Sequence, residues 1–280
     1  MLAALQAMSR FEKMRKESVP LITLSSDFGP GNIGCGAMEA AVFEICPEAK
    51  VIHWCHTTHG FDIKGGARNL EGVYKISVGF HVGVVDPGVG TKRRGIAIET
   101  KRGDFLIGPD NGLLRPAAEF LEGIVGAWEL THANYHRKNI SPIFHGRDIF
   151  APVAAHLANG VAPKELGPTI DVQTLVASPY PEATWKNGEL ECEVIHINEN
   201  GSCFLNVRAE EFKKAIRFGK KVSYSTCYHM LFSKTFGEVP KGDPLILPDD
   251  FGRIELAINQ GSFALAFGIK RGDKLLLKKG

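Results

Sequence analysis

The sequence lacks several features that would define a function class at once. No hydrophobic run approaches the roughly 20 residues that span a bilayer, so no transmembrane helix is expected. Charge of one sign is not in excess either, because 33 lysines and arginines face 31 aspartates and glutamates. Without a basic stripe, nucleic acid is not an expected partner. The six cysteines are scattered and form no C-x-x-C pair, which favours reduced thiols over a disulfide scaffold or a zinc site.

The first residues are not typical of a targeting segment. The opening MLAALQAM has no basic residue ahead of its apolar stretch, as a signal peptide would. We expect residues 1–19 to form a ragged or weakly helical extension. Hydrophobic residues at 44% and charged residues at 23% are typical of a globular domain with a substantial core. These patterns predict a cytoplasmic protein without a membrane partner.

Strand and helix patterns alternate over residues 20–170, the first predicted domain. Apolar, β-branched runs at 19–26 and 50–55 end in turns, and helical spacing follows each of them. A hairpin turning at 101–104 and a helix ending before Gly160 complete the pattern. Such alternation predicts an α/β domain whose mostly parallel sheet is flanked by helices.

The pattern changes in the second half of the chain. Four prolines between 161 and 188 interrupt any apolar period, and we assign 171–188 to a linker. Residues 189–280 contain short strands separated by Gly, Pro and Asn turns, with one short helix over 208–217. This pattern predicts a second domain that is a small antiparallel barrel or sandwich.

A glycine-rich turn follows the first strand, where Gly29, Gly31 and Gly34 satisfy G-x-G-x-x-G. A dinucleotide site would also need an acid at the end of the second strand, but no carboxylate follows it until Asp62. NAD binding is therefore disfavoured. Asp27, at the carboxyl end of the first strand, is better placed to accept the two hydroxyls of a ribose. A turn-forming role for Asp27 explains the local sequence equally well.

Three histidines, His53, His56 and His59, recur every third residue and raise the question of a metal site. The segment is β-branched and aromatic, so it is expected to be a strand that runs into a loop. Odd spacing on a strand directs successive histidines to opposite faces. No acid or cysteine completes a known ligand pattern. We therefore predict no metal here.

Polar residues also follow other predicted strands. Asp86 ends the strand in VVDPGVG, and Arg93 and Arg94 come shortly after it. Ligands of open α/β sheets bind beyond the carboxyl ends of the strands, so Asp86, like Asp27, is expected at that rim. His145 precedes a helix, and its residue type fits a structural or a catalytic role. Asp148 is expected to serve first-turn helix electrostatics.

Taken together, these motifs resemble one family over about residues 20–275, the S-adenosyl-L-methionine hydrolases, also called hydroxide adenosyltransferases, which are related to fluorinases and chlorinases. The combination of VVDPGVG with a downstream FHGRD is the specific part of the resemblance. The motifs that carry it are SSDFG (25–29), VVDPGVGTKRRGI (84–96), GPDNG (108–112), FHGRDIFAPVAA (144–155) and ELAINQGSFA (255–264).

The resemblance implies an α/β domain, a C-terminal antiparallel β-barrel domain, and a homotrimer with the site between subunits. It implies attack of water-derived hydroxide on ribose C5′, which releases adenosine and L-methionine without a cofactor. The matching water-holding set is Asp86, Arg93 and His145, in which either Asp86 or His145 could accept the proton. Asp27 matches the ligand of the ribose hydroxyls, and Phe144 is expected beside the substrate.

Further expected substrate contacts include positions where this chain departs from the family. Asn198 stands for an aspartate near the methionine end, Ser202 for an asparagine near the adenine, and Asp250 for a serine. Asn259 keeps the family residue near the adenine. Losing a charge-assisted hydrogen bond at 198 costs about 1.5–3 kcal/mol, so substrate fit is less certain than water handling. Gly146, within FHGRD, completes the predicted contacts.

Two other functions remain open. A protein that binds S-adenosyl-L-methionine or adenosine with little turnover would explain the altered 198–206 segment. A halide adenosyltransferase is disfavoured, because the halogenating relatives replace the Asp and His found here as Asp86 and His145. The fluorinases also carry an insertion after the glycine-rich turn, whereas only residues 91–107 separate VVDPGVG from GPDNG here.

Overall fold

The computed structural model describes residues 19–224 and 228–280. The chain divides between Pro179 and Tyr180 into two compact units. Except for Val19, the predicted N-terminal extension lies outside the described residues. Within the described residues, every helix is too short or too polar to cross a membrane.

The first unit contains a six-stranded sheet with strand order β2-β1-β3-β5-β4-β6. Strand β4 runs antiparallel to both of its neighbours, and the pairs β1–β2, β1–β3 and β3–β5 are parallel. The predicted mostly parallel sheet is confirmed. The strands are β1 (Leu21–Ser26), β2 (Lys50–Cys55), β3 (Phe80–Val84), β4 (Gly95–Thr100), β5 (Phe105–Pro109) and β6 (Ile124–Glu129).

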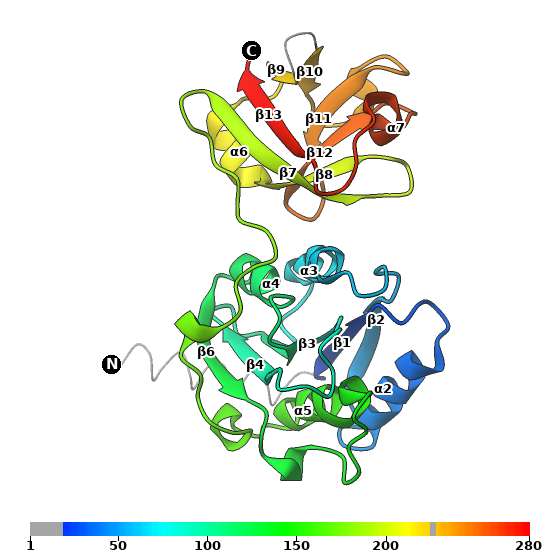
Figure 1. Cartoon of the computed structure of the whole chain (residues 1–280), viewed down its shortest axis with the longest axis vertical. Coiled ribbons are helices and arrows are strands. Elements are labelled where there is room, and N and C mark those ends of the chain that lie inside the picture. Colours follow the sequence, from blue (N-terminus) through cyan, green and yellow to red (C-terminus); the bar gives the residue numbers. More distant parts are fainter. Residues whose placement is uncertain (1–18, 225–227) are drawn as a thin grey trace. The chain divides into compact units, whose positions relative to one another are not determined.

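Helices cover both faces of this sheet, α2 and α5 on one side and α3 and α4 on the other (Figure 1). On the side of α2 and α5, small and β-branched side chains pack against the middle strands in one core cluster. The predicted hairpin is present as β4–β5, and Gly160, with φ of +92°, follows α5. The helices are α2 (Ile33–Phe43), α3 (Ile63–Glu71), α4 (Arg115–Phe120) and α5 (Ala151–Ala158), with a π-helical turn at Gly146–Phe150 before α5.

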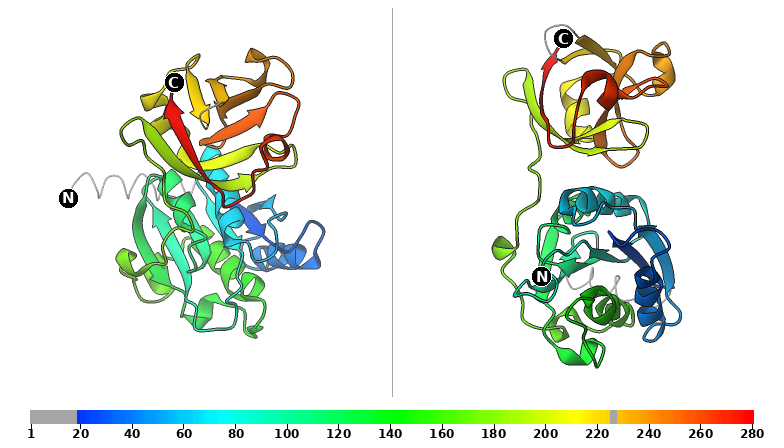
Figure 2. Two further views of the ribbon diagram at one scale, coloured as in Figure 1. Left: turned by 45° about the horizontal axis from the view of Figure 1, so that its top comes forward. Right: turned by 45° about the vertical axis from the view of Figure 1, so that its right-hand side comes forward.

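The second unit is a closed barrel with strand order β10-β11-β12-β8-β7-β13-β9 (Figure 2). All neighbours are antiparallel except β10 and β11. The barrel, and not the sandwich, is therefore the correct alternative. Its elements are β7 (Glu189–Ile197), β8 (Cys203–Arg208), α6 (Ala209–Ala215), β9 (Lys221–Tyr224), β10 (Tyr228–Phe232), β11 (Pro244–Pro248), β12 (Arg253–Ile258), α7 (Phe263–Phe267) and β13 (Lys274–Lys279).

An ion pair between a buried arginine and a partly exposed glutamate ties the segment before the barrel to its wall. Arg253 on β12 has no exposed surface, and its guanidinium donates two hydrogen bonds to the Glu182 carboxylate at 2.6 and 2.9 Å. The same guanidinium lies 5.4 Å from the ring centre of Tyr180. Residues 180–182, predicted to belong to a linker, are therefore held against the barrel by charge-assisted contacts.

The α/β unit contains a second buried polar network, which spans three elements. Thr23 Oγ1 lies 2.9 Å from His81 Nδ1, and His81 Nε2 lies 3.0 Å from Asp104 Oδ1. Arg102 donates to both oxygens of Asp104 at 2.7 and 2.8 Å. Burial alone would raise the pKa of Asp104, but these hydrogen bonds outweigh it and lower the pKa to about 2. Burial also lowers the pKa of His81, which keeps its ring neutral.

We predict that this network makes the free energy of unfolding fall as the pH is lowered. Asp104 contributes fully above its ordinary pKa of 3.8 and loses its contribution as the pH falls towards 2. His81 acts in the same direction, because below about pH 6.5 the unfolded chain takes up a proton that the folded chain excludes. Asp104→Asn should cost about 3 kcal/mol at pH 7 and flatten the acid limb of the curve. Urea unfolding between pH 7 and 2 measures both effects. An unchanged pH dependence in Asp104→Asn, with exposed Glu48→Gln as control, would contradict this assignment.

Candidate functional site

Two aspartates lie beyond the carboxyl ends of neighbouring strands. Strands β1 and β3 are parallel, and Ser26 pairs with Val84 at the ends of the two strands. Asp27 follows Ser26 directly, and Asp86 comes two residues after Val84. The register thus brings both carboxylates to one edge of the sheet, where ligands of open α/β sheets bind.

Asp86 belongs to a hydrogen-bonded set of three side chains. Arg93 donates from Nε to Asp86 Oδ1 at 3.1 Å and from Nη2 to Asp86 Oδ2 at 2.6 Å. The same Nη2 lies 2.9 Å from His145 Nδ1. The Arg93 and Asp86 side chains are only 9% and 5% exposed, so water screens this pair weakly. The structure therefore brings together the three residues that were predicted to handle water.

The contact with Arg93 determines which nitrogen of His145 carries a proton. A guanidinium can only donate, so Nδ1 must accept and the proton of the neutral ring lies on Nε2. Burial lowers the pKa of His145, and the positive charge of Arg93 lowers it further. The carboxylates of Asp86 and Asp148 act in the opposite direction without reversing the shift. At neutral pH His145 is therefore a neutral ring with an N–H at Nε2.

The loops that carry Arg93 and His145 meet backbone to backbone. Gly90 has φ of +74°, and a Cβ built on it would overlap the carbonyl oxygen of Pro142. Only glycine allows this approach, because any side chain would push the two loops apart. The close contact fixes the position of the His145 loop relative to the loop that follows Asp86.

Asp27 has one hydrogen bond from the chain. Its Oδ2 accepts from the backbone N–H of Phe61 at 2.8 Å. Within the described ranges no other donor binds this carboxylate, so Oδ1 can accept from a ligand. Phe61 has φ of +63° and a ring that is 77% exposed, an unusual conformation for an aromatic residue. This contact with Phe61 was not predicted from the sequence.

The residues around His145 divide into packing and positioning roles. Phe144 packs edge-on against Phe28, with ring centres 5.6 Å apart. Gly146 is buried, and a Cβ there would lie 3.0 Å from Met38 Sδ, so helix α2 requires a glycine at this place. Asp148 is buried and paired with Arg147 at 2.7 Å, and it also accepts from Ser141 N–H. These contacts agree with a structural role for Asp148. They are an ion pair and a hydrogen bond to a loop, whereas the sequence had predicted helix electrostatics.

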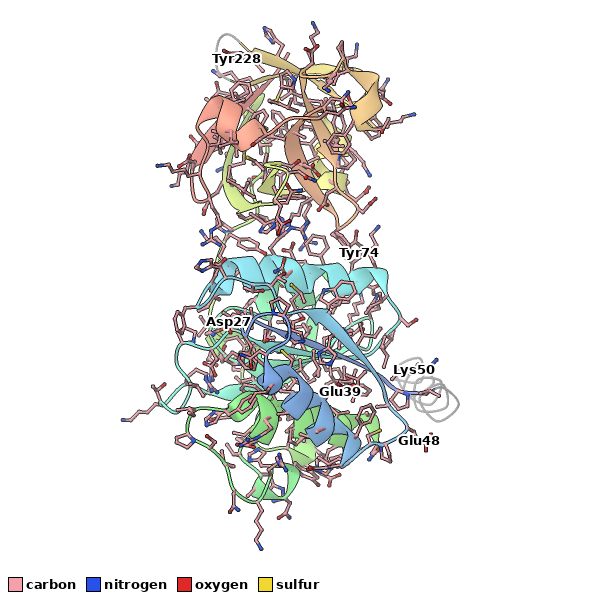
Figure 3. The ribbon with its side chains drawn as sticks, turned by 90° about the vertical axis from the view of Figure 1, so that its right-hand side faces the viewer. Asp27, Glu39, Glu48, Lys50, Tyr74 and Tyr228 are labelled. Atoms are coloured by element: carbon pink, nitrogen blue, oxygen red, sulfur yellow. The ribbon has the colours of Figure 1, made fainter. Side chains whose placement is uncertain are left out.

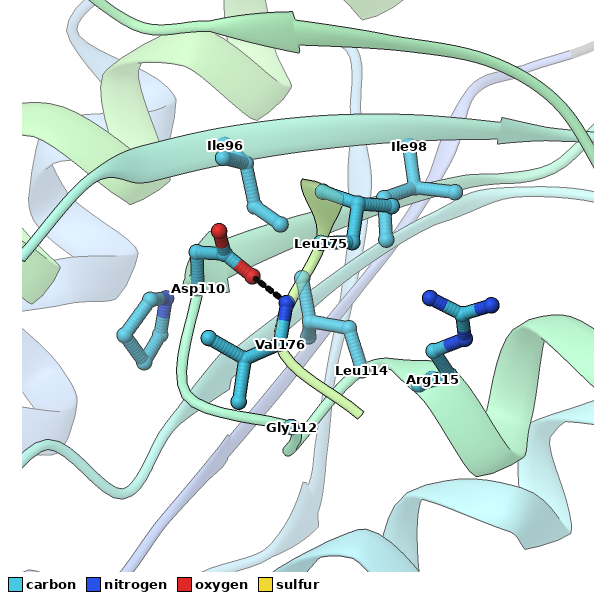
Figure 4. Close-up of a pocket in the computed structure, with 9 residues that line it drawn as sticks. Ile96, Ile98, Asp110, Gly112, Leu114, Arg115, Leu175 and Val176 are labelled. Atoms are coloured by element: carbon cyan, nitrogen blue, oxygen red, sulfur yellow. Dashed lines mark hydrogen bonds between the residues drawn. The ribbon is translucent and has the colours of Figure 1, made fainter. Parts of the chain in front are cut away.

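Arg94, the residue after Arg93, does not join the set formed by Asp86, Arg93 and His145. Its guanidinium pairs with Asp110 and donates to the Thr174 carbonyl at 2.6 Å. Asp110 in turn accepts from Val176 N–H at 3.0 Å, which fastens the segment around Val176, near the end of the first unit, to β4 and β5 (Figure 4). The cavity beside this contact measures about 10 Å³, which is room for about one water molecule. It is too small for a substrate.

The barrel has a larger hollow, of about 540 Å³. Three of the predicted substrate contacts, Asn198, Ser202 and Asn259, line it. Asn198 Oδ1 accepts from Ser202 N–H at 3.0 Å, so this amide also holds its own turn. Asp250 is exposed in the β11–β12 turn and does not line the hollow. Glu255, which was not singled out from sequence, is buried on β12 and does line it.

The three histidines are not arranged as the strand pattern predicted. His53 Nδ1 lies 2.8 Å from His56 Nε2, so these two rings are in contact and do not lie on opposite faces. The reason is that β2 ends at Cys55 and the β1–β2 register shifts beside it. Within residues 19–224 and 228–280 no group of three or more His, Cys, Asp or Glu side chains is arranged to hold a metal ion.

Comparisons with known proteins identify relatives over most of the chain. An (R)-S-adenosyl-L-methionine hydrolase of Salinispora tropica is 34% identical over 93% of this chain and 98% of its own. A fluorinase of Actinopolyspora mzabensis is 23% identical over 91% of this chain and 96% of its own. A crystal structure of an uncharacterized conserved protein from Thermotoga maritima superposes with a TM-score of 0.83 at 29% identity, covering 92% of this chain and 100% of that one.

Family models match most of the sequence. The model of the SAM hydroxide adenosyltransferase N-terminal domain matches residues 22–167, and that of the C-terminal domain matches residues 192–276. The two matches fall on the α/β unit and on the barrel. The chain therefore belongs to the SAM hydroxide adenosyltransferase family.

Proposed function

We propose that the protein hydrolyses S-adenosyl-L-methionine to adenosine and L-methionine. The observation that carries this proposal is the bridge from Arg93 to both Asp86 and His145 beyond the strand ends. Support also comes from the relatives, since the one from Salinispora tropica is named as a hydrolase of this substrate and the fluorinase is less similar.

The reaction needs a positioned water more than it needs a strong acid. The sulfonium is already a good leaving group, so no protonation or cofactor has to assist its departure. The water oxygen forms a bond to C5′ while the C5′–S bond breaks, and the electron pair of that bond stays on sulfur. Methionine leaves as a neutral thioether, and the water gives up one proton. Holding the oxygen in line with the C5′–S bond is therefore the main contribution to rate.

We assign proton acceptance to Asp86. His145 Nδ1 already accepts from Arg93, and Nε2 carries a proton, so the neutral ring has no free lone pair for a second one. Asp86 bonds Arg93 through both oxygens, yet each carboxylate oxygen retains a second lone pair. His145 would then orient the water through its Nε2–H. Arg93 holds the Asp86 carboxylate in place through two hydrogen bonds and stabilises the developing hydroxide.

The remaining residues are assigned to binding. Asp27 accepts the ribose hydroxyls, and Phe144 packs beside the sugar. The barrel hollow lined by Asn198, Ser202 and Asn259 suits the polar edges of an adenine or of the methionine end. We assign no substrate contact to Asp250, which lies outside the hollow. Gly146 is assigned to packing, because Met38 and Val84 occupy the space around it.

A second function, binding with little turnover, is favoured by one observation. The side-chain oxygen of Asn198 already accepts a hydrogen bond from Ser202 N–H. Asn198 would therefore bind a substrate ammonium more weakly than a free carboxylate would. The products formed by the purified protein distinguish the two functions.

The first prediction concerns the reaction. Incubation with S-adenosyl-L-methionine, with and without excess chloride, should give adenosine and methionine in equal amounts under both conditions. Asp86→Ala and His145→Ala should lower kcat about a hundredfold or more with little change in affinity. The value of kcat should be level above pH 7 and fall only below about pH 6.5, because the pKa of His145 is lowered from 6.5.

Chromatographic separation of the nucleosides decides among the outcomes. A 5′-chloro nucleoside would indicate a halide adenosyltransferase. Substrate that is bound in calorimetry but not converted would indicate the binding function. Unchanged turnover in both alanine variants would contradict the roles given to Asp86 and His145.

The second prediction concerns Asp27. Asp27→Ala removes the acceptor of the ribose hydroxyls, so KM should rise about ten- to a hundredfold while kcat changes much less. Asp27→Asn should show a smaller rise, because the amide keeps one acceptor oxygen. Steady-state kinetics with both variants measures the difference. A KM equal to that of the unmodified protein would remove the ribose contact from the proposal.

We further propose a cytoplasmic homotrimer whose site is completed by a neighbouring subunit. Large apolar side chains are exposed beside the site, one at the start of helix α2 and two on loops: Ile33 is 91% exposed, Phe61 77% and Ile143 79%. Apolar surface of this kind around a polar site is typical of a protein interface. The neighbouring subunit would cover the open side of the site, so that a small-molecule substrate would be shielded from bulk water.

The third prediction tests this assembly. Light scattering should give three times the mass of one chain, and Ile143→Lys should lower the trimer fraction and the activity in parallel. Val78→Lys is the matched control, because Val78 is exposed just before β3, at the opposite edge of the sheet. A fully active monomer would contradict the shared site.

A further inference from the structure

The turn that carries Asp27 is held by one neighbouring residue. The carbonyl oxygen of His56 accepts from Gly29 N–H at 3.0 Å. The imidazole of the same residue lies with Nδ1 2.7 Å from Ser26 Oγ, and Ser26 Oγ accepts from Phe28 N–H at 3.3 Å. His56 thus restrains the chain on both sides of Asp27, by its backbone and by its side chain.

A continuous chain of hydrogen bonds runs from this turn towards the surface. Beyond Ser26 and His56, His56 Nε2 lies 2.8 Å from His53 Nδ1, and His53 Nε2 lies 3.1 Å from Glu39 Oε2. Ser26 is 1% exposed and His56 9%, whereas the Glu39 side chain is 36% exposed. Figure 3 labels Glu39 on helix α2 and Asp27 in the turn after β1, the two regions that the chain connects.

Glu39 fixes the direction of every bond in the chain. An ionised carboxylate can only accept, so His53 donates from Nε2, and the neutral form of its ring then accepts at Nδ1. His56 must then donate from Nε2 and accept at Nδ1, and Ser26 must donate its O–H to that nitrogen. The lone pairs of Ser26 Oγ remain available for Phe28 N–H. Each donor therefore has one acceptor, and neighbouring polar groups strengthen one another in such chains.

The surroundings keep His56 neutral, as this arrangement requires. Burial lowers the pKa of His56 to about 4, and a charge on His53 would lower it further. From helix α2 the titratable side chains that face the chain are Cys35 and Glu39, and Cys35 also contacts Ser26. None of the four chain members touches the set formed by Asp86, Arg93 and His145.

We propose that His56 is a positioning residue for Asp27, and that the Ser26–His56–His53–Glu39 chain sets substrate affinity by fixing the geometry of the ribose-binding turn. The inference rests on the proposed function for the identity of the ligand. It adds a residue that acts through another, since His56 itself is not expected to touch the substrate. The restrained turn presents a carboxylate already in its binding position, so less ordering opposes binding.

The test combines four variants of the full-length protein. His56→Leu removes both side-chain hydrogen bonds at similar volume, and His56→Asn returns an acceptor close to the Nδ1 position. Glu39→Gln removes the group that fixes the direction of the chain and is partly exposed, so it should fold. Glu48→Gln is the matched control, because Glu48 is an exposed carboxylate outside the chain and is labelled in Figure 3.

His56→Leu should raise KM about tenfold with kcat within about twofold, the effect of one lost hydrogen bond to the turn. His56→Asn should recover part of this loss, Glu39→Gln should raise KM about threefold, and Glu48→Gln should change nothing. A lowered kcat with unchanged KM, or no kinetic effect of His56→Leu and Glu39→Gln, would overturn the proposal.

Hydrogen exchange separates this inference from the proposed function. In His56→Leu the amides of Phe28 and Gly29 should exchange faster than in the unmodified protein, whatever the reaction is. If the unmodified protein does not hydrolyse S-adenosyl-L-methionine, the proposed function fails, and adenosine affinity by calorimetry replaces KM. Unchanged exchange at Phe28 and Gly29 would overturn the positioning role even if the enzyme is a hydrolase.

Discussion

The site depends on one guanidinium. Arg93 contacts Asp86 with two of its nitrogens and reaches His145 with one of the same two, so a single planar group fixes a carboxylate and an imidazole together. Arginine suits this task because its donors form a rigid fork that stays charged at every working pH. A lysine would supply the charge without the geometry. This contact determines which nitrogen of His145 carries the proton. The roles proposed for the Asp86 carboxylate and for the His145 imidazole follow from that.

The two units contribute different kinds of polar surface. The α/β unit offers charged groups that restrain one another, as in the pairs Arg93–Asp86 and Arg147–Asp148. The barrel hollow offers mainly amides and a hydroxyl, with Glu255 as a buried carboxylate in its lining. In the proposed reaction, charges would favour the transition state, whereas amides would recognise a neutral heterocycle by shape and hydrogen bonding. The departures from the family pattern at Asn198 and Ser202 fall in the barrel hollow.

The sequence predicted those features of the fold and the site that depend on local residue patterns and on the positions of the strand ends. Asp27 and Asp86 could be placed because parallel strands end at a common edge, and the β4–β5 hairpin because a Gly-containing turn separates two apolar runs. Side-chain partners were harder to foresee. Arg93 and Arg94 are adjacent in sequence, yet the backbone sends one to Asp86 and the other to Asp110. His53 and His56 meet only because the strand ends between them. The π-helical turn after His145, and Glu255 facing the hollow, likewise depend on tertiary packing.

The close approach of Gly90 to the Pro142 carbonyl has a consequence for how the protein meets its substrate. Because the two loops touch through their backbones, a shift of one loop would displace the other, and we expect the side chains proposed to hold water to keep their relative positions. The geometry proposed for catalysis would then exist before any ligand arrives. Binding does not have to select a rare conformation, so the observed affinity is close to the intrinsic affinity of the competent state. An inhibitor of this protein would have to match a fixed shape and could not trap an open one.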